Sequence, residues 1–465
     1  MTKIKIFVFS IVAIFYLFGC GSMASQKQHF TGLNEKLRIR DYGAAVLQIE
    51  SAKDVGYRQK DRVQYYLDAG MLYHYNKEYS KSNEMLTKAE NAIDELYTKS
   101  ISKAAASMLL NDNVMDYSGE DYEDIYLNLF KALNYLALDE FDEAFVEIRR
   151  INNKLLLLED KHKKMANSLN MFKKKKAKFE TNKNQFHNSA LSRYLSLLLY
   201  RAEGKDDDAR IDLEKLREAW KLQTQIYNFS LPPVNSLLSK SEKVKIDFLV
   251  FTGMSPDKKT DTWYIHTEKD LLIIAETEEN PKGKQQLEDL NTIPWQGIKE
   301  GFHFKFQLPY LKEKASQIGK VRVLLDDVPK QELRMIEDME RVALETYKIK
   351  KPLVYLKTIT RTILKGLLAE KAKSKLDEQV GGGFAGILAR AAADLAVDST
   401  ENADLRISRF FPGKALMGEL EAEPGIHNIK IEYYSKSGSL LHVEDKGDIE
   451  FKVAGLNLIE SYYLY

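Results

Sequence analysis

The sequence predicts an α+β multidomain chain. An N-terminal α-helical repeat half is expected over residues 31–230, and a β-rich, sandwich-like half with a helical insertion over residues 244–465. Apolar residues recur at helical spacing up to Leu231-Pro232-Pro233, and beyond this Pro-Pro boundary they alternate with a period of two. A chain of 465 residues is also too long for one ordinary hydrophobic core, so two or three domains are expected.

Residues 1–19 have the pattern of a secretory signal peptide. Lys3 and Lys5 form a positive region, Ile6–Phe18 is apolar, and the only cysteine of the chain, Cys20, follows directly. The apolar run is too short for a comfortable membrane span. The four residues LFGC that end at Cys20 resemble the bacterial lipobox, which implies cleavage by signal peptidase II and lipidation of Cys20. The alternative is an apolar N-terminal anchor with an incidental cysteine.

Residues 20–30 are predicted to form a lipidated tether, because Gly21–Lys27 (GSMASQK) is small and polar. Lipoproteins carry more than one acyl chain, which is what stable anchoring requires. Gly21 stands where an Asp would resemble an inner-membrane retention signal. The predicted location is therefore the bacterial cell envelope, at the outer membrane and facing the periplasm.

The stretch Asp124–Lys154 matches the template of a tetratricopeptide repeat (TPR) helix pair. Ala132 holds the small-residue position of the first helix, Tyr135 holds the aromatic position, and Phe141 opens the second helix. Small residues let two helices approach closely. Such a pair cannot bury its apolar stripe alone, so stacked neighbours are expected around it.

Three further matches surround this pair. Their small-residue positions are Ala45, Ser82 and Ala209, which correspond to Ala144 in the central pair. Only the interval from 45 to 82 is close to the 34-residue TPR period. The longer intervals imply inserted segments, so we predict a degenerate TPR-like α-solenoid.

The inserted segments carry two patterns of their own. Residues 160–184 show a narrow apolar stripe that predicts a long helix with one buried edge. Within it, the run Lys173–Lys176 has two interpretations. It is either a contact for an anionic polymer or for lipid head groups, or a solvated helix face, and we favour the solvated face. Residues 115–123 (MDYSGEDYE) are acidic and rich in tyrosine. This stretch lies against the concave surface of the array or leads into the next helix as an acidic first turn.

Alternating apolar residues predict the strands of the second half. The clearest runs are Ile246–Val250, Phe302–Leu308 and Val321–Leu325. Lys282–Leu290 is polar and predicts a loop or a short helix. Strands resume after Phe411-Pro412-Gly413, and the simplest assembly is an antiparallel β-sandwich.

A helical excursion over about residues 331–400 interrupts this sandwich. Leu333, Ile336, Met339 and Val342 have helical spacing over Gln331–Tyr347, and a further helix is expected over Leu353–Leu376. Gly381–Gly383 ends that helix. Phe384–Val397 then predicts a helix of small residues, for which we favour burial over membrane contact.

No motif for catalysis, cofactor binding or metal coordination stands in the sequence. The eight histidines are scattered without ligand spacing, and Gly381–Gly383 lacks the Lys-Ser/Thr of a phosphate cradle. With Cys20 acylated, no cysteine is left for a disulfide or a nucleophile. The net charge of +1 argues against a nucleic-acid binder. We therefore predict a protein that is not an enzyme and that has no cofactor, metal or catalytic residue.

Several stretches carry a family likeness. They are Tyr117–Glu123 leading into KALNYLALDEFDEAFVEIRR, then Ala190–Leu216, Arg361–Ala372, and Ala403–Ala415 with EPGIH. In these stretches the chain resembles an uncharacterised family of TPR-containing bacterial envelope lipoproteins. Asp139 departs from the Gly that is usual in the repeat turn. The resemblance implies a lipid-anchored envelope protein and transfers no catalytic residue; the repeats support an interaction role by analogy of fold.

The leading functional hypothesis is a lipid-anchored adaptor or scaffold that binds envelope proteins or peptides through its TPR-like repeats. The candidate partner-binding residues are Tyr117, Glu120, Asp121 and Tyr122. One alternative is a cell-wall or polysaccharide enzyme, or an enzyme activator, that uses the β-rich half. Another is an accessory lipoprotein of an envelope assembly or secretion complex. If the β-rich half fills the concave groove of the array, peptide capture in that groove is disfavoured; the oligomeric state stays open.

Overall fold

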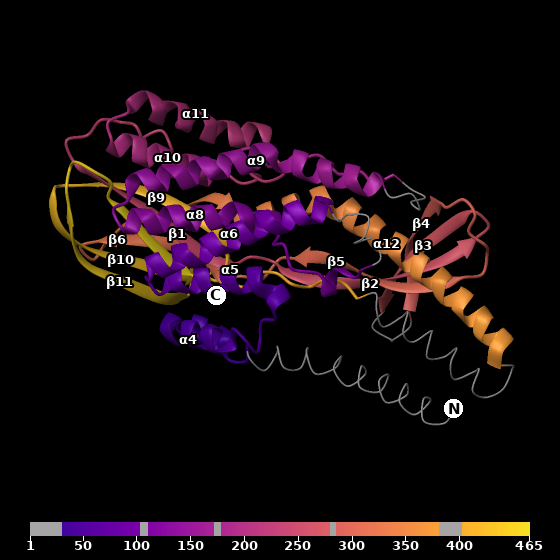
Figure 1. Cartoon of the computed structure of the whole chain (residues 1–465). Helices are drawn as coiled ribbons and strands as arrows, with labels where there is room; N and C mark the ends of the chain where they lie inside the picture. Colours follow the sequence, from indigo (N-terminus) through magenta and orange to yellow (C-terminus); the bar gives the residue numbers. More distant parts are fainter. Residues whose placement is uncertain (1–29, 103–109, 172–177, 280–284, 381–401) are drawn as a thin grey trace.

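Helices make up the N-terminal half and three sheets dominate the C-terminal half, which confirms the predicted α+β class (Figure 1). The computed structural model describes residues 30–102, 110–171, 178–279, 285–380 and 402–465. The predictions for the signal peptide, for Cys20, for Lys173–Lys176 and for residues 381–397 lie outside the described residues.

The helical half consists of helix pairs joined by short turns. The pairs are α3 (Leu33–Arg38) with α4 (Tyr42–Ala52), α5 (Arg62–Tyr75) with α6 (Tyr79–Ser102), α8 (Asp121–Ala137) with α9 (Phe141–Asn170), and α10 (Ala190–Ala202) with α11 (Asp206–Leu222). The short 3₁₀ turns η1 (Gln59–Asp61) and η2 (Asp112–Val114) precede α5 and α8. The small residues predicted to lie between paired helices, Ala45, Ser82, Ala132, Ala144 and Ala209, are all 0 % exposed.

The four pairs turn through the same backbone motif. A residue in the left-handed conformation follows the first helix of each pair: Arg40 (φ 62°), Lys77 (φ 62°), Asp139 (φ 59°) and Gly204 (φ 72°). The next amide donates to the carbonyl five residues earlier, from Asp41 to Lys36 (2.8 Å), Glu78 to Tyr73 (2.9 Å), Glu140 to Tyr135 (2.8 Å) and Lys205 to Tyr200 (2.8 Å). These are the helix-ending bonds of a Schellman motif, which favours glycine at its left-handed position. Three of the four positions carry a side chain instead.

Replacing Lys77 with glycine is expected to raise the free energy of unfolding by about 1 kcal/mol, because a Cβ is disfavoured in the left-handed region by roughly that amount. The reverse change, Gly204→Ala, should lower the free energy of unfolding by a similar amount. Both are measured by urea denaturation. A Lys77→Gly protein less stable than the wild type would show that the Lys77 side chain outweighs the backbone term.

The strands form three four-stranded sheets. Sheet A has the order β12 (Leu458–Tyr463), β1 (Val244–Met254), β9 (Pro412–Ala422), β8 (Arg334–Asp338). Sheet B has the order β4 (Gln285–Pro294), β3 (Leu271–Glu279), β2 (Asp257–Glu268), β5 (His303–Lys312). Sheet C has the order β11 (Leu440–Phe451), β10 (Gly425–Ser435), β6 (Ile318–Leu325), β7 (Val328–Glu332). Among these strands β12 pairs with β1 in parallel, a pairing that the predicted antiparallel sandwich did not include.

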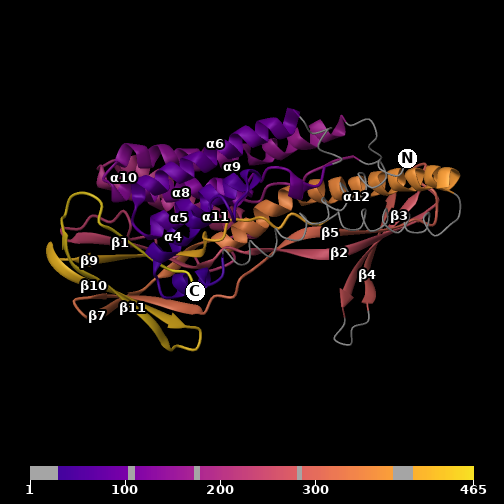
Figure 2. The same cartoon turned by 60° about the horizontal axis from the view of Figure 1, so that its bottom comes forward.

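Sheet A is the middle layer between the helices and sheet C (Figure 2). In β1, Leu249 and Phe251 pack into the core that includes the helices. Ile246, Phe248 and Val250 point the other way, into the core shared with sheet C. Because alternate residues of a strand face opposite sides, both faces of β1 are buried and its sequence is almost continuously apolar.

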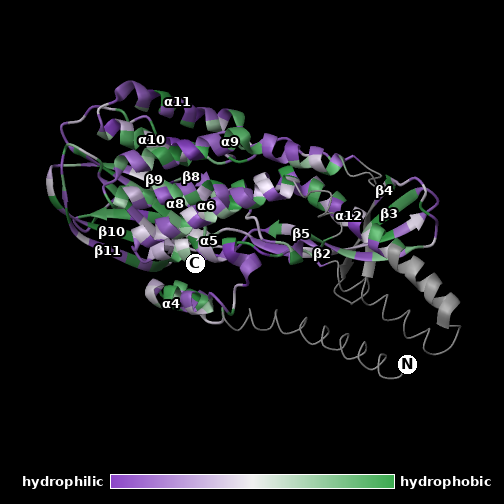
Figure 3. Cartoon of the chain, viewed as in Figure 1, coloured by the Kyte–Doolittle hydropathy of each residue, from purple (hydrophilic) through white to green (hydrophobic). Residues whose placement is uncertain are grey.

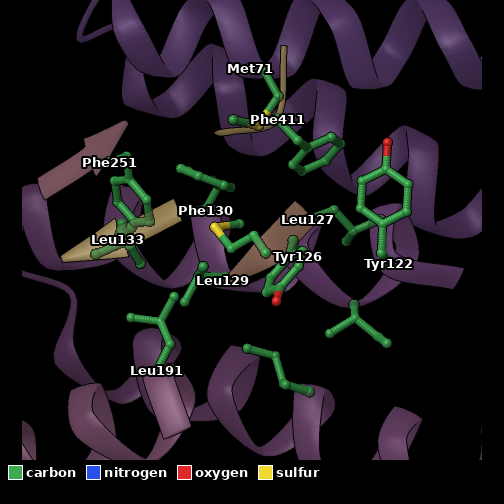
Figure 4. Close-up of a cluster of buried hydrophobic side chains, with 14 of the residues drawn as sticks. Met71, Tyr122, Tyr126, Leu127, Leu129, Phe130, Leu133, Leu191, Phe251 and Phe411 are labelled. Carbon is green, nitrogen blue, oxygen red and sulfur yellow. The ribbon is translucent and has the colours of Figure 1, made fainter. Parts of the chain in front are cut away.

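One hydrophobic core joins the two halves of the chain (Figure 4). The ring of Phe130 on α8 lies 5.2 Å from that of Phe251 on β1 and 6.0 Å from that of Phe411, centroid to centroid. At the C-terminus, the Tyr462 hydroxyl donates to the Tyr75 carbonyl of α5 at 2.5 Å. Figure 3 shows hydrophobic strands such as β10 beneath helices with hydrophilic outer turns, as on α11. The β-rich half therefore covers the inner face of the helical half.

Sheet B has a separate core, which it shares with the long helix α12 (Met339–Val380). Ile359 and Ile363 of α12 pack with Phe304 and Phe306 of β5. At Gly366 the helix approaches the sheet so closely that an added Cβ would lie 2.0 Å from the Phe304 ring. In Figure 1, α12 runs along this sheet away from the other helices.

The helix predicted over Gln331–Tyr347 begins later than expected. Residues 334–338 form strand β8, and α12 starts at Met339. Leu333 faces the core between sheets A and C, whereas Ile336 faces the helical core. An irregularity in the pairing of β8 with β9, between Met335 and Glu337, accompanies this change of side. The three-residue spacing of Leu333 and Ile336 therefore does not indicate a helix in this segment.

The two helices expected on either side of Pro352 are one helix. Proline has no N–H to donate to the carbonyl four residues earlier, so the Lys348 carbonyl would lack its helical partner. Asn182 replaces that partner, because its side-chain Nδ2 donates to the Lys348 carbonyl at 2.9 Å and its backbone N–H donates to the Ile349 carbonyl at 3.2 Å. A residue from the distant 178–189 segment thus lets α12 continue through the proline.

Two other expectations differ from the structure, and two strands were not expected. The polar stretch Lys282–Leu290 contributes its described residues to strand β4. The predicted 160–184 helix is the end of α9, which stops at Asn170, and Phe179 then packs back on Leu169 outside any helix. Strands β2 and β3 were not predicted, since their polar and apolar residues do not alternate cleanly.

Candidate partner-binding cleft

A cleft of about 580 Å³ lies between the helical half and α12. Its walls come from α6, from residues 110–121, from α9, and from α12, with smaller contributions from β2, β5 and residues 402–404. This volume is in the usual range for ligand pockets. The cleft is therefore large enough to hold a ligand or a peptide side chain.

Both apolar and charged residues line the cleft. The apolar ones include Ile93 and Leu96 of α6, Met165 of α9, and Leu353 and Val354 of α12. The basic lining residues are Lys99, Lys161, Lys258, Lys350, Lys357 and Arg361, and the acidic ones are Asp112, Asp116, Glu120, Asp121 and Asp404. The cleft can thus hold both an apolar side chain and a charged group.

The acidic stretch 115–123 runs along the cleft and enters α8. Asp121, Glu123 and Asp124 occupy the first turn of α8, where the helix dipole favours negative charge. Glu120 and Glu123 form a capping box, with each side chain bonded to the backbone of the other. Of the two predicted arrangements, the acidic first turn is the one observed.

Glu120 is a buried carboxylate that lines the cleft. It is 4 % exposed and pairs with two lysines, Lys258 of β2 and Lys350 of α12, the latter at 2.7 Å. Burial acts to raise the pKa of Glu120, but the two ammonium groups hold it below its ordinary value. Glu120 therefore stays ionised and fastens three elements together.

Two further ion pairs border the floor. Asp112 pairs with Lys357 at 2.7 Å, and despite burial the lysine and Arg361 lower the pKa of Asp112 to about 2. Asp121 contacts His162 at 2.7 Å and Lys161 at 3.3 Å, and these two neighbours likewise lower its pKa against the effect of burial. These carboxylates are held ionised, whereas a general acid would need a raised pKa.

Glu123 has the opposite behaviour. It is 0 % exposed and accepts bonds from the Tyr117 hydroxyl (2.7 Å), the Glu120 amide (2.7 Å) and the Ser408 amide (2.5 Å). Burial, and then the Glu120 carboxylate, raise the pKa of Glu123 to about 7. A carboxyl whose pKa is higher in the folded state favours folding at low pH and loses this contribution as the pH rises through the folded value.

The stability of the wild type is therefore expected to fall more steeply than that of Glu123→Gln between about pH 5 and pH 8. The difference in the change of unfolding free energy should approach about 3 kcal/mol, since one pKa unit corresponds to about 1.4 kcal/mol. Urea denaturation at several pH values measures it. Parallel pH profiles for the two proteins would mean that Glu123 is ionised throughout this range.

The inner face of the helical half, where a repeat array would present its groove, is occupied by residues 402–411 of the same chain. The Gln64 side chain donates to the Ile407 carbonyl at 2.8 Å, and the Tyr75 hydroxyl donates to the Phe410 carbonyl at 2.7 Å. Asp68 accepts from the Arg409 amide at 2.8 Å. Helical side chains thus bind the backbone of an extended segment, and the segment belongs to the fold.

The four predicted partner-binding residues do not act as one exposed surface. Tyr117, Glu120 and Asp121 line the cleft, but each is at most 4 % exposed and is tied to neighbours. Tyr122 points into the shared core, where its ring lies 6.0 Å from that of Phe411 (Figure 4). The sequence did not single out Lys258 of β2 and Lys350 of α12 as partners of Glu120, because nothing in the local pattern distinguishes them from surface lysines.

Comparison with protein-family models, with curated proteins and with solved structures finds no match to this chain. Within the described ranges, no helix is both long and apolar enough to span a membrane. The same residues contain no group of three or more His, Cys, Asp or Glu side chains arranged for a metal ion.

Proposed function

We propose that the chain is a lipid-anchored adaptor that holds a protein or peptide partner in the cleft between its helical half and α12. In this proposal Cys20 carries the lipid, the protein faces the periplasm from the outer membrane, and the helical half is a degenerate TPR-like array. The cleft between the two halves is the observation that supports the proposal most directly. The four shared turns and buried small residues support the repeat origin of the helices.

The cleft, rather than the inner face of the repeats, is the proposed contact. That inner face is covered by sheet A and by residues 402–411, so a partner would have to displace the core of the protein to enter it. At the mouth of the cleft, Leu110 and Val114 are 50 % and 60 % exposed. Exposed apolar side chains beside a concave site are typical of a binding surface.

The chemistry of the cleft favours a partner segment with an apolar side chain next to acidic ones. Leu110 and Val114 offer apolar contact, and Lys357 of α12, which pairs with Asp112 at 2.7 Å, lines the same cleft. Ionised, paired carboxylates such as Asp112 and Glu120 suit a fixed recognition surface better than acid–base catalysis. These observations favour the adaptor over an enzyme.

Site-specific photo-crosslinking in cells tests the proposal. A photo-reactive residue at Val114 should give one discrete protein adduct, whereas the same residue at Leu222, which is 76 % exposed on α11, should give none. The charge reversal Lys357→Glu should reduce the Val114 adduct at least several-fold. Equal adducts at both positions, or none at Val114, would count against the cleft.

The anchor is tested separately. Cys20→Ala is expected to move the protein from the membrane fraction to the soluble or uncleaved pool, because no acyl chain can be attached. Fractionation with an antibody measures this shift, and Ser22→Ala serves as the control. Unchanged membrane association and processing of the Cys20→Ala protein would refute lipidation.

A further inference from the structure

Strands β2 and β5 bring two histidines together on the exposed face of sheet B. His266 and His303 stand directly opposite each other in the antiparallel register, and their ring centroids are 4.4 Å apart. The two Nδ1 atoms are 3.2 Å apart. Both side chains are accessible to solvent. The chain separates these residues widely, so only the pairing of the strands creates the pair (Figure 2).

The separation of the two nitrogens matches a metal chelate. Histidine nitrogens bind Zn²⁺ at about 2.0–2.1 Å, so two such bonds at a tetrahedral angle place their nitrogens about 3.3–3.4 Å apart. The observed 3.2 Å is close to this value. Directly opposed cross-strand side chains are also near enough to act together without a change of backbone.

Glu268 supplies a second, independent observation. Its carboxylate Oε1 lies 3.1 Å from Nε2 of His266, the ring nitrogen that faces away from His303. A carboxylate in this position holds the imidazole proton on Nε2, so Nδ1 carries a lone pair, which accepts the hydrogen bond from Nδ1 of His303. His266 is therefore oriented as metal-binding histidines commonly are. His303 reaches the same state when its own proton resides on Nε2.

The strand scaffold next to the pair is rigid. Thr267 is 0 % exposed, its amide donates to the Phe302 carbonyl at 3.0 Å, and its hydroxyl donates to the Lys299 carbonyl at 2.8 Å. The Phe302 amide in turn donates to the Thr267 hydroxyl at 2.9 Å. These bonds fix the register beside His266 and His303, so the pair needs little reorganisation to chelate an ion.

We propose that His266 and His303 form a surface site for a late first-row transition-metal ion, with Glu268 as the positioning residue behind His266. Two imidazole ligands suit Cu²⁺, Ni²⁺ and Zn²⁺, and the usual order of stability places Cu²⁺ first. Water completes the coordination, which makes the ion exchangeable. The site lies on sheet B and is independent of the cleft and of the adaptor proposal.

Titration of the full mature chain, without a histidine tag, with Cu²⁺ alone tests this site. Calorimetry should give one ion per chain, and the electron paramagnetic resonance spectrum should show two coordinated nitrogens. His266→Ala and His303→Ala should each abolish this binding, while His427→Ala, which removes another accessible histidine, should leave it unchanged. All three positions are near the surface, so the variants are expected to fold.

Glu268→Gln is expected to weaken Cu²⁺ binding by 10–100-fold, the usual effect of removing a carboxylate behind a metal-binding histidine. Saturable binding that survives His303→Ala, or the absence of any stoichiometric binding by the wild type, would overturn the site. An unchanged affinity in Glu268→Gln would overturn the role given to Glu268.

Discussion

Replacing Lys131 with methionine is expected to lower the free energy of unfolding by about 3–5 kcal/mol, the usual result of removing one partner from a buried ion pair. Lys131 of α8 is 2 % exposed, and its Nζ lies 2.9 Å from Glu90 of α6 and 2.9 Å from Glu147 of α9. Asn128 also donates to both carboxylates, at 2.8 Å and 2.6 Å. Without the Lys131 ammonium group, the buried carboxylates of Glu90 and Glu147 would lose one of the positive charges that balance them.

The pH dependence of this loss provides a second measurement. Burial acts to raise the pKa of Glu90, but Lys154 and Lys131 lower it to about 2. A carboxylate with a depressed folded pKa stabilises the protein above its unfolded value and loses this effect as the pH falls. The difference between wild type and Lys131→Met should therefore shrink below about pH 4.

Two controls accompany Lys131→Met. Lys88→Met removes an exposed pair with Glu84 on α6 and should change the unfolding free energy by less than about 1 kcal/mol. Adding Glu147→Gln to Lys131→Met should restore part of the stability, because it removes one of the two negative charges that lose their Lys131 partner. A Lys131→Met protein as stable as the wild type would show that water or rearrangement compensates Glu90 and Glu147.

Phe411→Ala is expected to cost about 3–5 kcal/mol, the range for a large aromatic side chain in a packed core. Phe411 is 0 % exposed and lies at the centre of the core that joins the two halves, next to Phe130 and Tyr122 (Figure 4). The matched control is Leu405→Ala in the same extended segment, since Leu405 is 39 % exposed and should lose less than about 1 kcal/mol. Urea denaturation measures both.

The same experiment shows whether the halves unfold together. Because Phe130, Phe251 and Phe411 belong to one core, far-ultraviolet circular dichroism of the helices and near-ultraviolet circular dichroism of the aromatic side chains should report coincident transitions in the wild type. Phe411→Ala should shift both transitions equally. A helical transition that stays in place while the other moves would show that the helical half folds by itself.

Local patterns predicted the elements whose structure is set by near neighbours. Ala132 and Ala144 lie between paired helices as expected, and Ile246, Phe248 and Val250 lie on one face of a strand. Such periodicities record which side of an element is buried, so they can be read without knowing what covers it. The order of a helical half followed by sheets follows from the same patterns.

Prediction failed where a distant residue changed the local outcome. The spacing of Leu333 and Ile336 is compatible with a helix, but pairing with β9 makes this segment a strand. The two helices expected on either side of Pro352 are one helix, because the Asn182 side chain bonds the Lys348 carbonyl that the proline leaves without a partner. In both cases a tertiary contact outweighs a propensity of about 1–3 kcal/mol.

The sequence by itself determined that paired helices precede the sheets, and where these helices turn. Only the tertiary structure decided that residues 402–411 fill the inner face of the helices, that a cleft opens beside α12, and that His266 meets His303. The physical reason is that helical and strand periods depend on residues a few positions apart. Clefts and ligand pairs depend instead on which distant segments come together, and one sequence alone carries no local signal for that.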